Sequence, residues 1–332
     1  MRLAINGYGR VGQCILRAIF DAGLEKDFQI VAINDLADHA LMCHLTQYDS
    51  TFGVAKYEVT YSNDAMHIND QSIPLFSCED ATRLPWQDLG VDICLECSGH
   101  FASRDLAQQH LVAGAKKVLV SQPCIDADKT IVYGVNHQTL TANDHIVSNA
   151  SCTTNCLAPL LAVLQKTIGV QSGIMTTIHS YTNDQNLIDK LKGDVYRSRS
   201  ATQSMIPTRT GAAKAIGLVI PELEGKLHGM AIRIPTINVS LIDLTIITEK
   251  ESSIEEIHQY IKHAAENELK GVLAYNDKPL VSIDLKGHPA SSIFDANHTA
   301  IMGNQIKLMS WYDNEWAFSL RMLDVAKVIL SL

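Results

Sequence analysis

The sequence predicts an α/β fold: a Rossmann-type, doubly wound parallel sheet, followed by an α+β domain with a mostly antiparallel sheet. Three observations carry this prediction. Short apolar runs typical of strands alternate with segments of helical periodicity through the first half of the chain. A glycine-rich turn separates the first of these strands from the first helix. In the second half the predicted strands are longer and alternate in polarity, as in sheets with one exposed face.

The first half supplies the predicted parallel sheet. Its strands are predicted at residues 3–5, 29–33, 93–97, 117–120 and 145–147. Helical periodicity is found between them, at residues 11–22 and 103–112. Strands joined by helices favour a parallel sheet, because a parallel connection needs a long crossover. The stretch from Tyr57 to Pro74 breaks this pattern, and we expect an antiparallel hairpin insertion there.

The second half predicts the antiparallel sheet. Its strands are expected at residues 173–178, 231–235, 239–248 and 306–311, and its helices at residues 210–220 and 253–268. The second helix begins with a capping pattern, Ser253 followed by Glu256. The long polar segment 180–207 predicts a functional loop or a subunit contact. We expect a first domain of residues 1–150, joined by a C-terminal helix within 315–332 that packs back on it, and a second domain of residues 151–314.

Composition narrows the functional classes. The formal charge of −9 disfavours a sequence-independent grip on nucleic-acid phosphates, so no nucleic acid is expected as a partner. A local basic group, made of Arg197, Arg199, Arg209 and Lys214, fits small anions better. No apolar run is long enough to span a bilayer, so no membrane association is expected.

The cysteine content predicts a reducing compartment. Eight cysteines occur in a long chain whose first predicted strand begins near its start, so we expect no signal peptide, a cytoplasmic location and reduced thiols. The pair Cys94 and Cys97 has the spacing of half a zinc site. No second pair with ligand spacing follows it, so no metal is expected.

The glycine-rich turn predicts a dinucleotide site. Gly7, Gly9 and Gly12 lie between a strand and a helix, the context that the dinucleotide-binding fingerprint requires. The helix N-terminus then faces the pyrophosphate. Asp35 follows the second strand, where a carboxylate accepts the ribose hydroxyls and repels a 2′-phosphate, which favours NAD over NADP. The alternative is a glycine-rich turn that binds nothing.

A cysteine surrounded by hydroxyl groups is the candidate nucleophile. Cys152 stands between Ser151 and Thr153, at the start of an apolar helix whose dipole favours thiolate over thiol. A thiolate together with a hydride acceptor predicts aldehyde oxidation through a thioester. His179, at the end of a strand, is the candidate base, although the sequence does not place it beside Cys152. The alternative is a buried structural cysteine, the role we expect for Cys156.

Two features predict a bound anion. Arg233 lies in an otherwise apolar strand, so its guanidinium needs an anionic partner. That partner is either a phosphorylated substrate or, alternatively, a carboxylate in a structural ion pair. Thr210 and Gly211 open a helix, another geometry that binds anions.

These motifs closely resemble phosphorylating glyceraldehyde-3-phosphate dehydrogenases of the bacterial type. The resemblance covers nearly the whole chain and is carried by residues 4–12, 148–159, 176–185, 206–215, 233–238 and 310–316. It implies oxidation of glyceraldehyde 3-phosphate by NAD, with inorganic phosphate as second substrate. Cys152 thiolate would form a hemithioacetal, and after hydride transfer phosphate would attack the thioester to release 1,3-bisphosphoglycerate. The family is usually a homotetramer, which implies that segment 180–207 lies near a neighbour's cofactor.

The resemblance also implies roles for individual residues. Cys152 is the nucleophile and His179 the base. The substrate phosphate would be held by Thr182, Arg197 and Arg233, and the attacking phosphate by Ser151, Thr153, Thr210 and Gly211. The cofactor would be held by Gly7, Gly9, Arg10, Val11, Gly12, Asp35, Ser121 and Asn314.

Two rivals and two departures qualify this interpretation. Erythrose-4-phosphate dehydrogenase shares the thiol, the histidine and the nucleotide site, but its members tend to lose the Thr210–Lys214 segment that this chain keeps. A dinucleotide-binding regulator would need neither Cys152 nor His179. Many NAD-using relatives carry Leu-Pro where this chain has Lys190-Leu191, and an arginine near Cys78-Glu79. Both departures concern the affinity for the cofactor.

Overall fold

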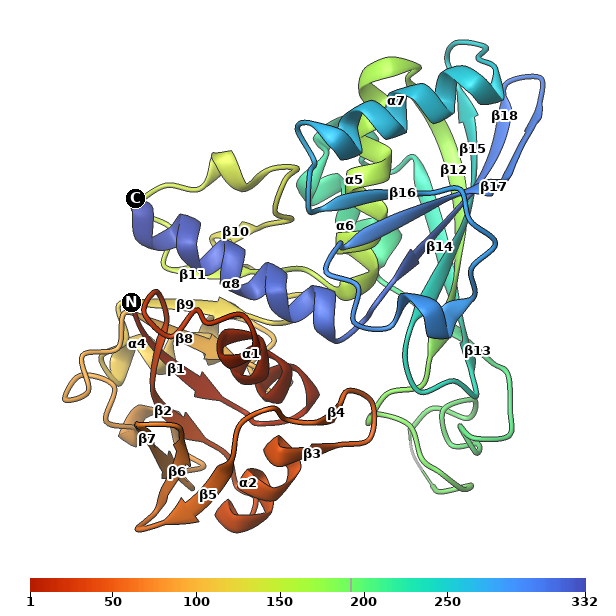
Figure 1. Cartoon of the computed structure of the whole chain (residues 1–332). Helices are drawn as coiled ribbons and strands as arrows, with labels where there is room; N and C mark the ends of the chain where they lie inside the picture. Colours follow the sequence, from red (N-terminus) through yellow and green to blue (C-terminus); the bar gives the residue numbers. More distant parts are fainter. Residues whose placement is uncertain (192) are drawn as a thin grey trace. The chain divides into compact units, whose positions relative to one another are not determined.

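A computed structural model describes residues 1–191 and 193–332. The chain divides into two compact units. The first unit contains Met1–Ile131, His137–Ala150 and Ser319–Leu332, and the second contains Val132–Asn136 and Ser151–Phe318 (Figure 1).

A nine-stranded sheet forms the centre of the first unit. Its strand order is β10-β11-β9-β8-β1-β2-β7-β6-β5. The strands from β10 to β7 pair in parallel; they are β10 (Lys129–Thr130), β11 (Ile146–Ser148), β9 (Lys117–Val120), β8 (Ile93–Glu96), β1 (Arg2–Asn6), β2 (Gln29–Asn34) and β7 (Gln71–Phe76). The strands β6 (Ala65–Ile68) and β5 (Val59–Ser62) continue the sheet in antiparallel pairing. The predicted hairpin is therefore three strands that extend the main sheet, because β7 pairs with β2.

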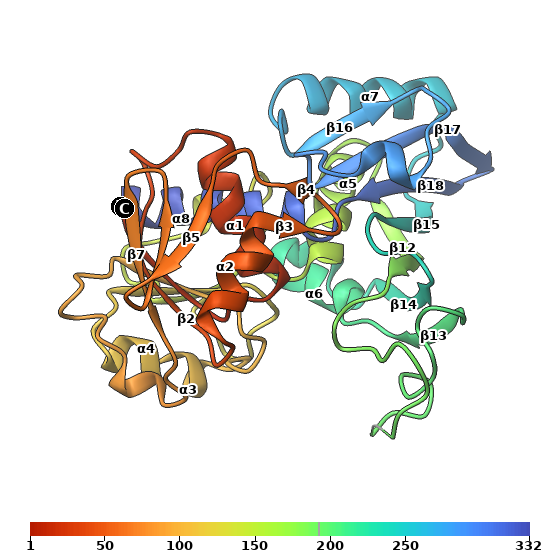
Figure 2. The same ribbon diagram turned by 60° about the horizontal axis from the view of Figure 1, so that its bottom comes forward.

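Helices cover both faces of this sheet, as the doubly wound prediction requires. The helices α1 (Arg10–Asp21) and α8 (Trp316–Ser331) lie on one face, while the short helices α3 (Arg104–Ala107) and α4 (Gln109–Val112) lie on the other (Figure 2). In α8 the Ser319 hydroxyl donates to the carbonyl of Val11 at 3.4 Å. The helix α2 (His39–Gln47) and a two-stranded ribbon, β3 (Tyr48–Asp49) with β4 (Gly53–Val54), follow β2.

The second unit is built on a seven-stranded sheet. Its order is β13 (Ile206–Arg209), β14 (Leu227–Ile234), β12 (Val170–Ser180), β15 (Ser240–Thr248), β18 (Gln305–Tyr312), β17 (Ser292–Met302) and β16 (Leu273–Asn276). Four of the six neighbouring pairs are antiparallel, which confirms the mostly antiparallel prediction. The strands β13, β16 and β17 were not predicted; β13 overlaps the end of the polar segment 180–207.

Three helices cover one face of this second sheet. They are α5 (Cys152–Thr167), α6 (Ala212–Val219) and α7 (Ile254–Glu266), and α5 packs against both of the others (Figure 1). The capping box predicted from Ser253 and Glu256 is confirmed at the start of α7. Ile174, Met230 and Ile247 are exposed on strands of this sheet. Within residues 1–191 and 193–332, no helix is long and apolar enough to cross a membrane.

Candidate active site

The N-terminus of α5 carries the predicted thiol. Ser151 is the N-cap, and its hydroxyl accepts a hydrogen bond from the Thr154 backbone N–H at 3.1 Å. Cys152 is therefore the first residue of the helix, where the unpaired N–H groups of the first turn make the potential positive. The cap explains the local fold: a serine before an apolar run ends the extended chain and starts the helix.

The structure brings His179 to this sulfur. The Cys152 Sγ lies 3.6 Å from His179 Nε2. On the other side of the ring, Nδ1 lies 2.6 Å from the carbonyl oxygen of Ser180. A carbonyl oxygen only accepts, so Nδ1 carries the proton in the neutral ring and Nε2 presents a lone pair to the thiol. This tautomer is the one that a general base for Cys152 needs.

Burial shifts the pKa of both groups toward their uncharged forms. Burial raises the pKa of Cys152, against the opposing effects of the Arg233 charge and a hydrogen bond with Thr153. Burial also lowers the pKa of His179 to about 3, and the nearby Arg233 charge lowers it further. Desolvation therefore opposes the helix dipole, which was expected to favour the thiolate, and shifts the pKa of Cys152 toward the thiol. Both shifts favour the thiol and the neutral imidazole over the thiolate–imidazolium pair.

Strand register explains why Arg233 lies beside His179. The strands β12 and β14 are parallel neighbours, and His179 is the register partner of Arg233. Register partners on adjacent strands point to the same face of a sheet, and here that face is covered by α5. The sequence does not reveal this pairing, because nothing in it fixes which strands are neighbours.

Arg233 has a charge without a carboxylate partner. Its Nη1 donates to the Ser180 carbonyl at 3.1 Å and to the Thr182 hydroxyl at 2.9 Å. Its Nε is buried and has no hydrogen-bond partner in the part of the chain that the structure describes. Among the same described residues, no carboxylate forms an ion pair with Arg233. The alternative considered from the sequence, a structural ion pair with a carboxylate, is therefore absent from this part of the chain. A buried, unpartnered N–H beside a free charge fits a bound anion.

A second arginine is anchored near Thr182. Arg197 forms an ion pair with Asp184 at 2.6 Å, and its Nε donates to the Thr208 hydroxyl at 3.0 Å. The Thr182 hydroxyl also donates to Asp184. Asp184 pairs with Arg197, whereas Arg233 has no carboxylate partner among the described residues, so a net positive charge remains around Thr182. Sequence reasoning assigned no role to Asp184 or Thr208.

Tyr312 is a further residue that the sequence did not single out. Its buried hydroxyl lies 2.8 Å from the Thr153 hydroxyl and 2.7 Å from the Thr177 hydroxyl. Its ring meets the His179 ring edge to face, with centroids 5.8 Å apart. Tyr312 thus supports both the first turn of α5 and the imidazole. Its position at the end of β18 gave no sign of this role.

The predicted cofactor residue Asn314 is held in one orientation. Its Oδ1 accepts from the Ser180 hydroxyl at 2.8 Å and from the Ser240 hydroxyl at 3.2 Å. Its amide nitrogen makes no hydrogen bond among residues 1–191 and 193–332, so it remains a donor for a ligand. Thr210 and Gly211 precede α6, and the Thr210 hydroxyl accepts from the Ala212 N–H at 3.2 Å. Neither residue contacts the Cys152 group by a hydrogen bond in the described chain.

The glycine turn of the first unit fits a dinucleotide. Gly7 has φ +88°, and a Cβ there would lie 2.3 Å from the Ser98 backbone, so only glycine is compatible. Gly12 approaches the Gly7 carbonyl almost as closely, since a Cβ at Gly12 would lie 2.5 Å from that oxygen. At Gly9 nothing lies within 4 Å of such a Cβ, so backbone N–H groups are accessible to a phosphate. The helix α1, whose N-cap is Gly9, has no acidic residue in its first turn, which leaves its N-terminus suited to anions.

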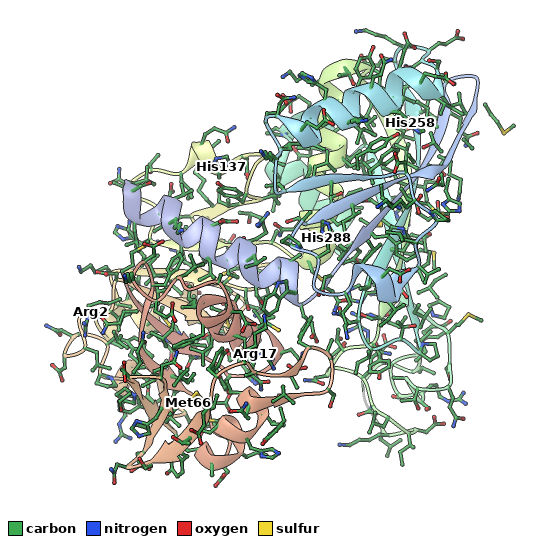
Figure 3. The ribbon with its side chains drawn as sticks, viewed as in Figure 1. Arg2, Arg17, Met66, His137, His258 and His288 are labelled. Atoms are coloured by element: carbon green, nitrogen blue, oxygen red, sulfur yellow. The ribbon has the colours of Figure 1, made fainter. Side chains whose placement is uncertain are left out.

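The side chains around this turn hold it in place. Asp35 accepts the backbone N–H of Tyr8 at 2.6 Å, so the predicted ribose carboxylate also fixes the turn. The buried Tyr8 hydroxyl lies 2.7 Å from the Thr46 hydroxyl and 3.9 Å from the sulfur of Met66. In α1, Arg17 donates to the carbonyl of Gly53 at 3.0 Å (Figure 3).

The remaining predicted cofactor residues lie near the turn or on neighbouring strand ends. Arg10 forms a bidentate pair with Asp49, at 2.7 and 3.2 Å, and Val11 is the next residue of α1. Ser121 follows β9, and its N–H donates to the carbonyl of Glu96 at 2.9 Å. The described residues contain no group of three histidine, cysteine or acidic side chains arranged to bind a metal.

Comparison with known proteins decides the family. The model of the glyceraldehyde 3-phosphate dehydrogenase NAD binding domain matches residues 1–104, and the model of the C-terminal domain of the same family matches residues 151–314. The chain belongs to the glyceraldehyde 3-phosphate dehydrogenase family. It is therefore an NAD-dependent oxidoreductase, and its cofactor is NAD.

Curated relatives of this family are similar over their full length. Glyceraldehyde-3-phosphate dehydrogenase of Pseudomonas aeruginosa is 54% identical over 326 residues, which cover 98% of this chain and 97% of the relative. Glyceraldehyde-3-phosphate dehydrogenase 1 of Bacillus cereus is 47% identical, covering 99% of this chain and 98% of the relative. The enzyme of Geobacillus stearothermophilus is 47% identical over 100% of this chain and 98% of its own.

Proposed function

We propose that the chain oxidises D-glyceraldehyde 3-phosphate with NAD and inorganic phosphate to 1,3-bisphosphoglycerate, through a covalent thioester on Cys152. The observation that carries the proposal is the 3.6 Å approach of Cys152 Sγ to His179 Nε2, next to the uncompensated charge of Arg233. The thiol supplies a nucleophile, the imidazole a base, and the guanidinium a site for an anionic substrate.

Substrate binding is assigned to the positive group around Thr182. Arg233 and Thr182, with Arg197, bind the phosphate of the aldehyde. The unpartnered Nε of Arg233 supports this role, because a phosphate oxygen would satisfy it. Asp184 keeps Arg197 and Thr182 in place by accepting from both. A phosphorylated aldehyde is then held with its carbonyl carbon near the sulfur, which lowers the entropic barrier to attack.

His179 moves the proton in the first chemical step. Its Nε2 lone pair takes the Cys152 proton as the sulfur adds to the aldehyde carbon, and the product is a hemithioacetal. The proton on Nδ1 stays on that nitrogen and is donated in a hydrogen bond to the Ser180 carbonyl, which keeps the ring aligned. The imidazolium that forms is stabilised by the adjacent thiolate, or by the alkoxide of the adduct, because opposite charges offset the desolvation penalty in the buried pair.

The cofactor residues are assigned to the first unit's turn and to Asn314. NAD, when bound, accepts a hydride from the hemithioacetal carbon, which turns the adduct into a thioester. Asp35 would bind the ribose hydroxyls, and the amide nitrogen of Asn314 would donate to the nicotinamide carboxamide. The other residues that would hold the cofactor are Gly7, Gly9, Arg10, Val11, Gly12 and Ser121.

Phosphate completes the reaction. An oxygen of inorganic phosphate attacks the thioester carbon, the C–S bond breaks, and the sulfur regains a proton as the acyl phosphate leaves. The attacking phosphate is assigned to Ser151, Thr153, Thr210 and Gly211, with His179 donating to the thioester oxygen. The two N-terminal helix ends support this assignment, because free N–H groups at such ends bind anions.

Steady-state NADH formation tests the proposal. With glyceraldehyde 3-phosphate, turnover should require inorganic phosphate, and erythrose 4-phosphate should be a poorer substrate. Substitution of phosphate by a non-nucleophilic anion of equal charge, such as sulfate, serves as the control for ionic strength. A rate that ignores phosphate and prefers erythrose 4-phosphate would contradict the proposal, because it would indicate hydrolysis of the thioester.

We further propose a homotetramer in the cytoplasm, with residues 1–150 and 315–332 as the NAD-binding domain and residues 151–314 as the catalytic domain. An active thiol needs a reducing compartment. Large apolar side chains between residues 181 and 209 are highly exposed, which supports burial against another copy; they are Leu187, Ile188, Leu191, Val195, Tyr196 and Met205. Light scattering on the purified chain should give four times the monomer mass.

A further inference from the structure

The first unit buries two titratable side chains that the proposed reaction does not use. Glu96, the last residue of β8, is 1% exposed, and His110 of α4 is fully buried. Burying a carboxylate is costly unless several donors satisfy it. The hydrogen-bond donors around Glu96 therefore determine whether its carboxylate can stay ionised in the interior.

Four donors converge on the Glu96 carboxylate. Oε1 accepts from the backbone N–H of Ser98 at 2.7 Å and from the Ser98 hydroxyl at 2.5 Å. Oε2 accepts from the Asn6 amide at 2.5 Å and lies 2.9 Å from His110 Nε2. Each carboxylate oxygen thus has two partners, which is the pattern expected of an ionised carboxylate.

Trp86 fixes the protonation of the histidine in this network. Its indole N–H lies 3.1 Å from His110 Nδ1. An indole nitrogen only donates, so Nδ1 accepts, and the ring proton is on Nε2, where it faces Glu96. The imidazole is therefore neutral in this arrangement. No arginine or lysine in the described residues pairs with Glu96, so its negative charge is not cancelled locally.

The other titratable groups near this charge are thiols. Burial raises the pKa of both Cys94 and Cys97, and the Glu96 charge is the second cause of the increase in each case. The Glu96 charge also contributes to the raised pKa of Cys124, after burial. These thiols stay protonated, so they do not neutralise the carboxylate.

The network lies at the carboxyl ends of β1 and β8. The strand order β9-β8-β1-β2 places the reversal of winding between β1 and β8, and ligands of open α/β sheets bind at the carboxyl ends of strands at such a point. Asn6 ends β1 and Glu96 ends β8, so the hydrogen bond between their side chains links the ends of these two strands. The Gly7 turn touches the backbone of Ser98, the residue that Glu96 holds.

We propose that Glu96 is a specificity-determining residue of the cofactor site, whose locked negative charge favours the oxidised cofactor over the reduced one. The two forms of the cofactor share the same phosphates and differ in charge at the nicotinamide ring, which is cationic only when oxidised. A buried, uncancelled anion at these strand ends stabilises the cationic form more than the neutral form, because the low dielectric of the interior leaves its field poorly screened. The inference rests on NAD as the cofactor and is independent of the proposed thioester chemistry.

Equilibrium binding to the full-length chain tests this proposal without any turnover. The dissociation constants of NAD and NADH are measured by calorimetry for the wild type and Glu96→Gln. We expect the ratio Kd(NAD)/Kd(NADH) to rise about tenfold in the variant, equivalent to about 1.4 kcal/mol. Asp92→Asn is the matched control: Asp92 is a carboxylate at the opposite end of β8, bonded to the backbone N–H of Arg2, and the ratio should stay within twofold.

Further variants separate charge from structure. Ser98→Ala removes one donor but keeps the charge, so it should leave the ratio unchanged even if both affinities fall. If Glu96→Gln does not fold, the double variant Glu96→Gln/His110→Gln replaces the pair by two amides. The same ratio of dissociation constants is then measured without the Glu96 charge. Equal weakening of NAD and NADH in the neutralised protein, or no change in either, would overturn the proposal and leave Glu96 with a structural role only.

Discussion

Two polar clusters, one in each unit, differ in how completely their hydrogen bonds are satisfied. Around Glu96, every polar side-chain atom of Glu96, His110 and Trp86 forms a hydrogen bond with another protein group. Around Cys152, the Arg233 Nε has no partner among the described residues, and the thiol faces an imidazole lone pair. A closed cluster keeps a scaffold in one geometry, whereas an open cluster leaves groups available for a ligand. The Cys152 cluster therefore has groups available for reaction, whereas the hydrogen bonds of the Glu96 cluster fix its own geometry.

The largest expected effect separates two cysteines one helical turn apart. Cys152→Ser should reduce NADH formation by on the order of 10⁴-fold or more, because it removes the nucleophile. Cys156 is fully buried, its sulfur lies 3.7 Å from the Ser292 hydroxyl, and burial raises its pKa to about 12. Cys156→Ser should therefore retain activity within a few-fold. Equal losses of activity in both variants would contradict the assignment of Cys152 as the nucleophile.

Two arginines give the next largest contrast. Arg233→Gln should reduce kcat/KM for the phosphorylated aldehyde by about 100-fold, since a charge-assisted contact contributes roughly 1.5–3 kcal/mol. Unphosphorylated glyceraldehyde should be affected little. Arg104, which pairs with Asp128, is the control, and Arg104→Gln should leave both values nearly unchanged. An equal loss of kcat/KM with both aldehydes would show that Arg233 does not bind the substrate phosphate.

The buried imidazole predicts a pH dependence of stability. The pKa of His179 is lowered to about 3, from a usual value of 6.5, so between these values the unfolded chain binds a proton that the folded chain does not. Wild-type stability should fall as the pH drops through this range, with a contribution of up to about 1.4 kcal/mol per pH unit. His179→Asn should remove this contribution. Urea unfolding at pH 7.5 and 5.5 measures it; parallel losses in both proteins would contradict the assigned neutral state.

The smallest expected effect compares two serine caps. Ser253 caps α7 at the surface and Ser151 caps α5 at the thiol site. Alanine at either position should cost about 1 kcal/mol of stability. Only Ser151→Ala should raise the KM for inorganic phosphate, and thermal unfolding with initial rates separates the two effects. A raised KM in Ser253→Ala would show that the effect comes from general destabilisation.

The sequence predicted elements whose signal is local. The strand at Arg2–Asn6, the glycine turn and the capping box at Ser253 are all encoded within a few neighbouring residues, and the structure contains each of them. The strand β17 was missed, because its second half is polar and largely exposed, so alternation gave little contrast. The edge strand β13, which contains Pro207, was missed for a similar reason.

The site itself needed information that the sequence does not carry. Cys152 and His179 were chosen for their chemistry, but their 3.6 Å approach depends on α5 packing over β12. The placement of Arg233 beside His179 depends on the register of β12 with β14. Tyr312 and Asp184 went unnoticed because their importance comes only from those contacts. The burial that raises the pKa of Cys152 likewise depends on the tertiary fold.

Mass spectrometry of the trapped acyl-enzyme, before and after digestion, is the most direct test of the covalent step at Cys152. The protein is mixed with NAD and glyceraldehyde 3-phosphate in the absence of inorganic phosphate, then quenched in acid and digested. We expect one acyl group per chain, mapped to Cys152 and absent from Cys156, that disappears when inorganic phosphate is added before the quench. An active enzyme that carries no adduct, or carries it on another residue, would contradict the account.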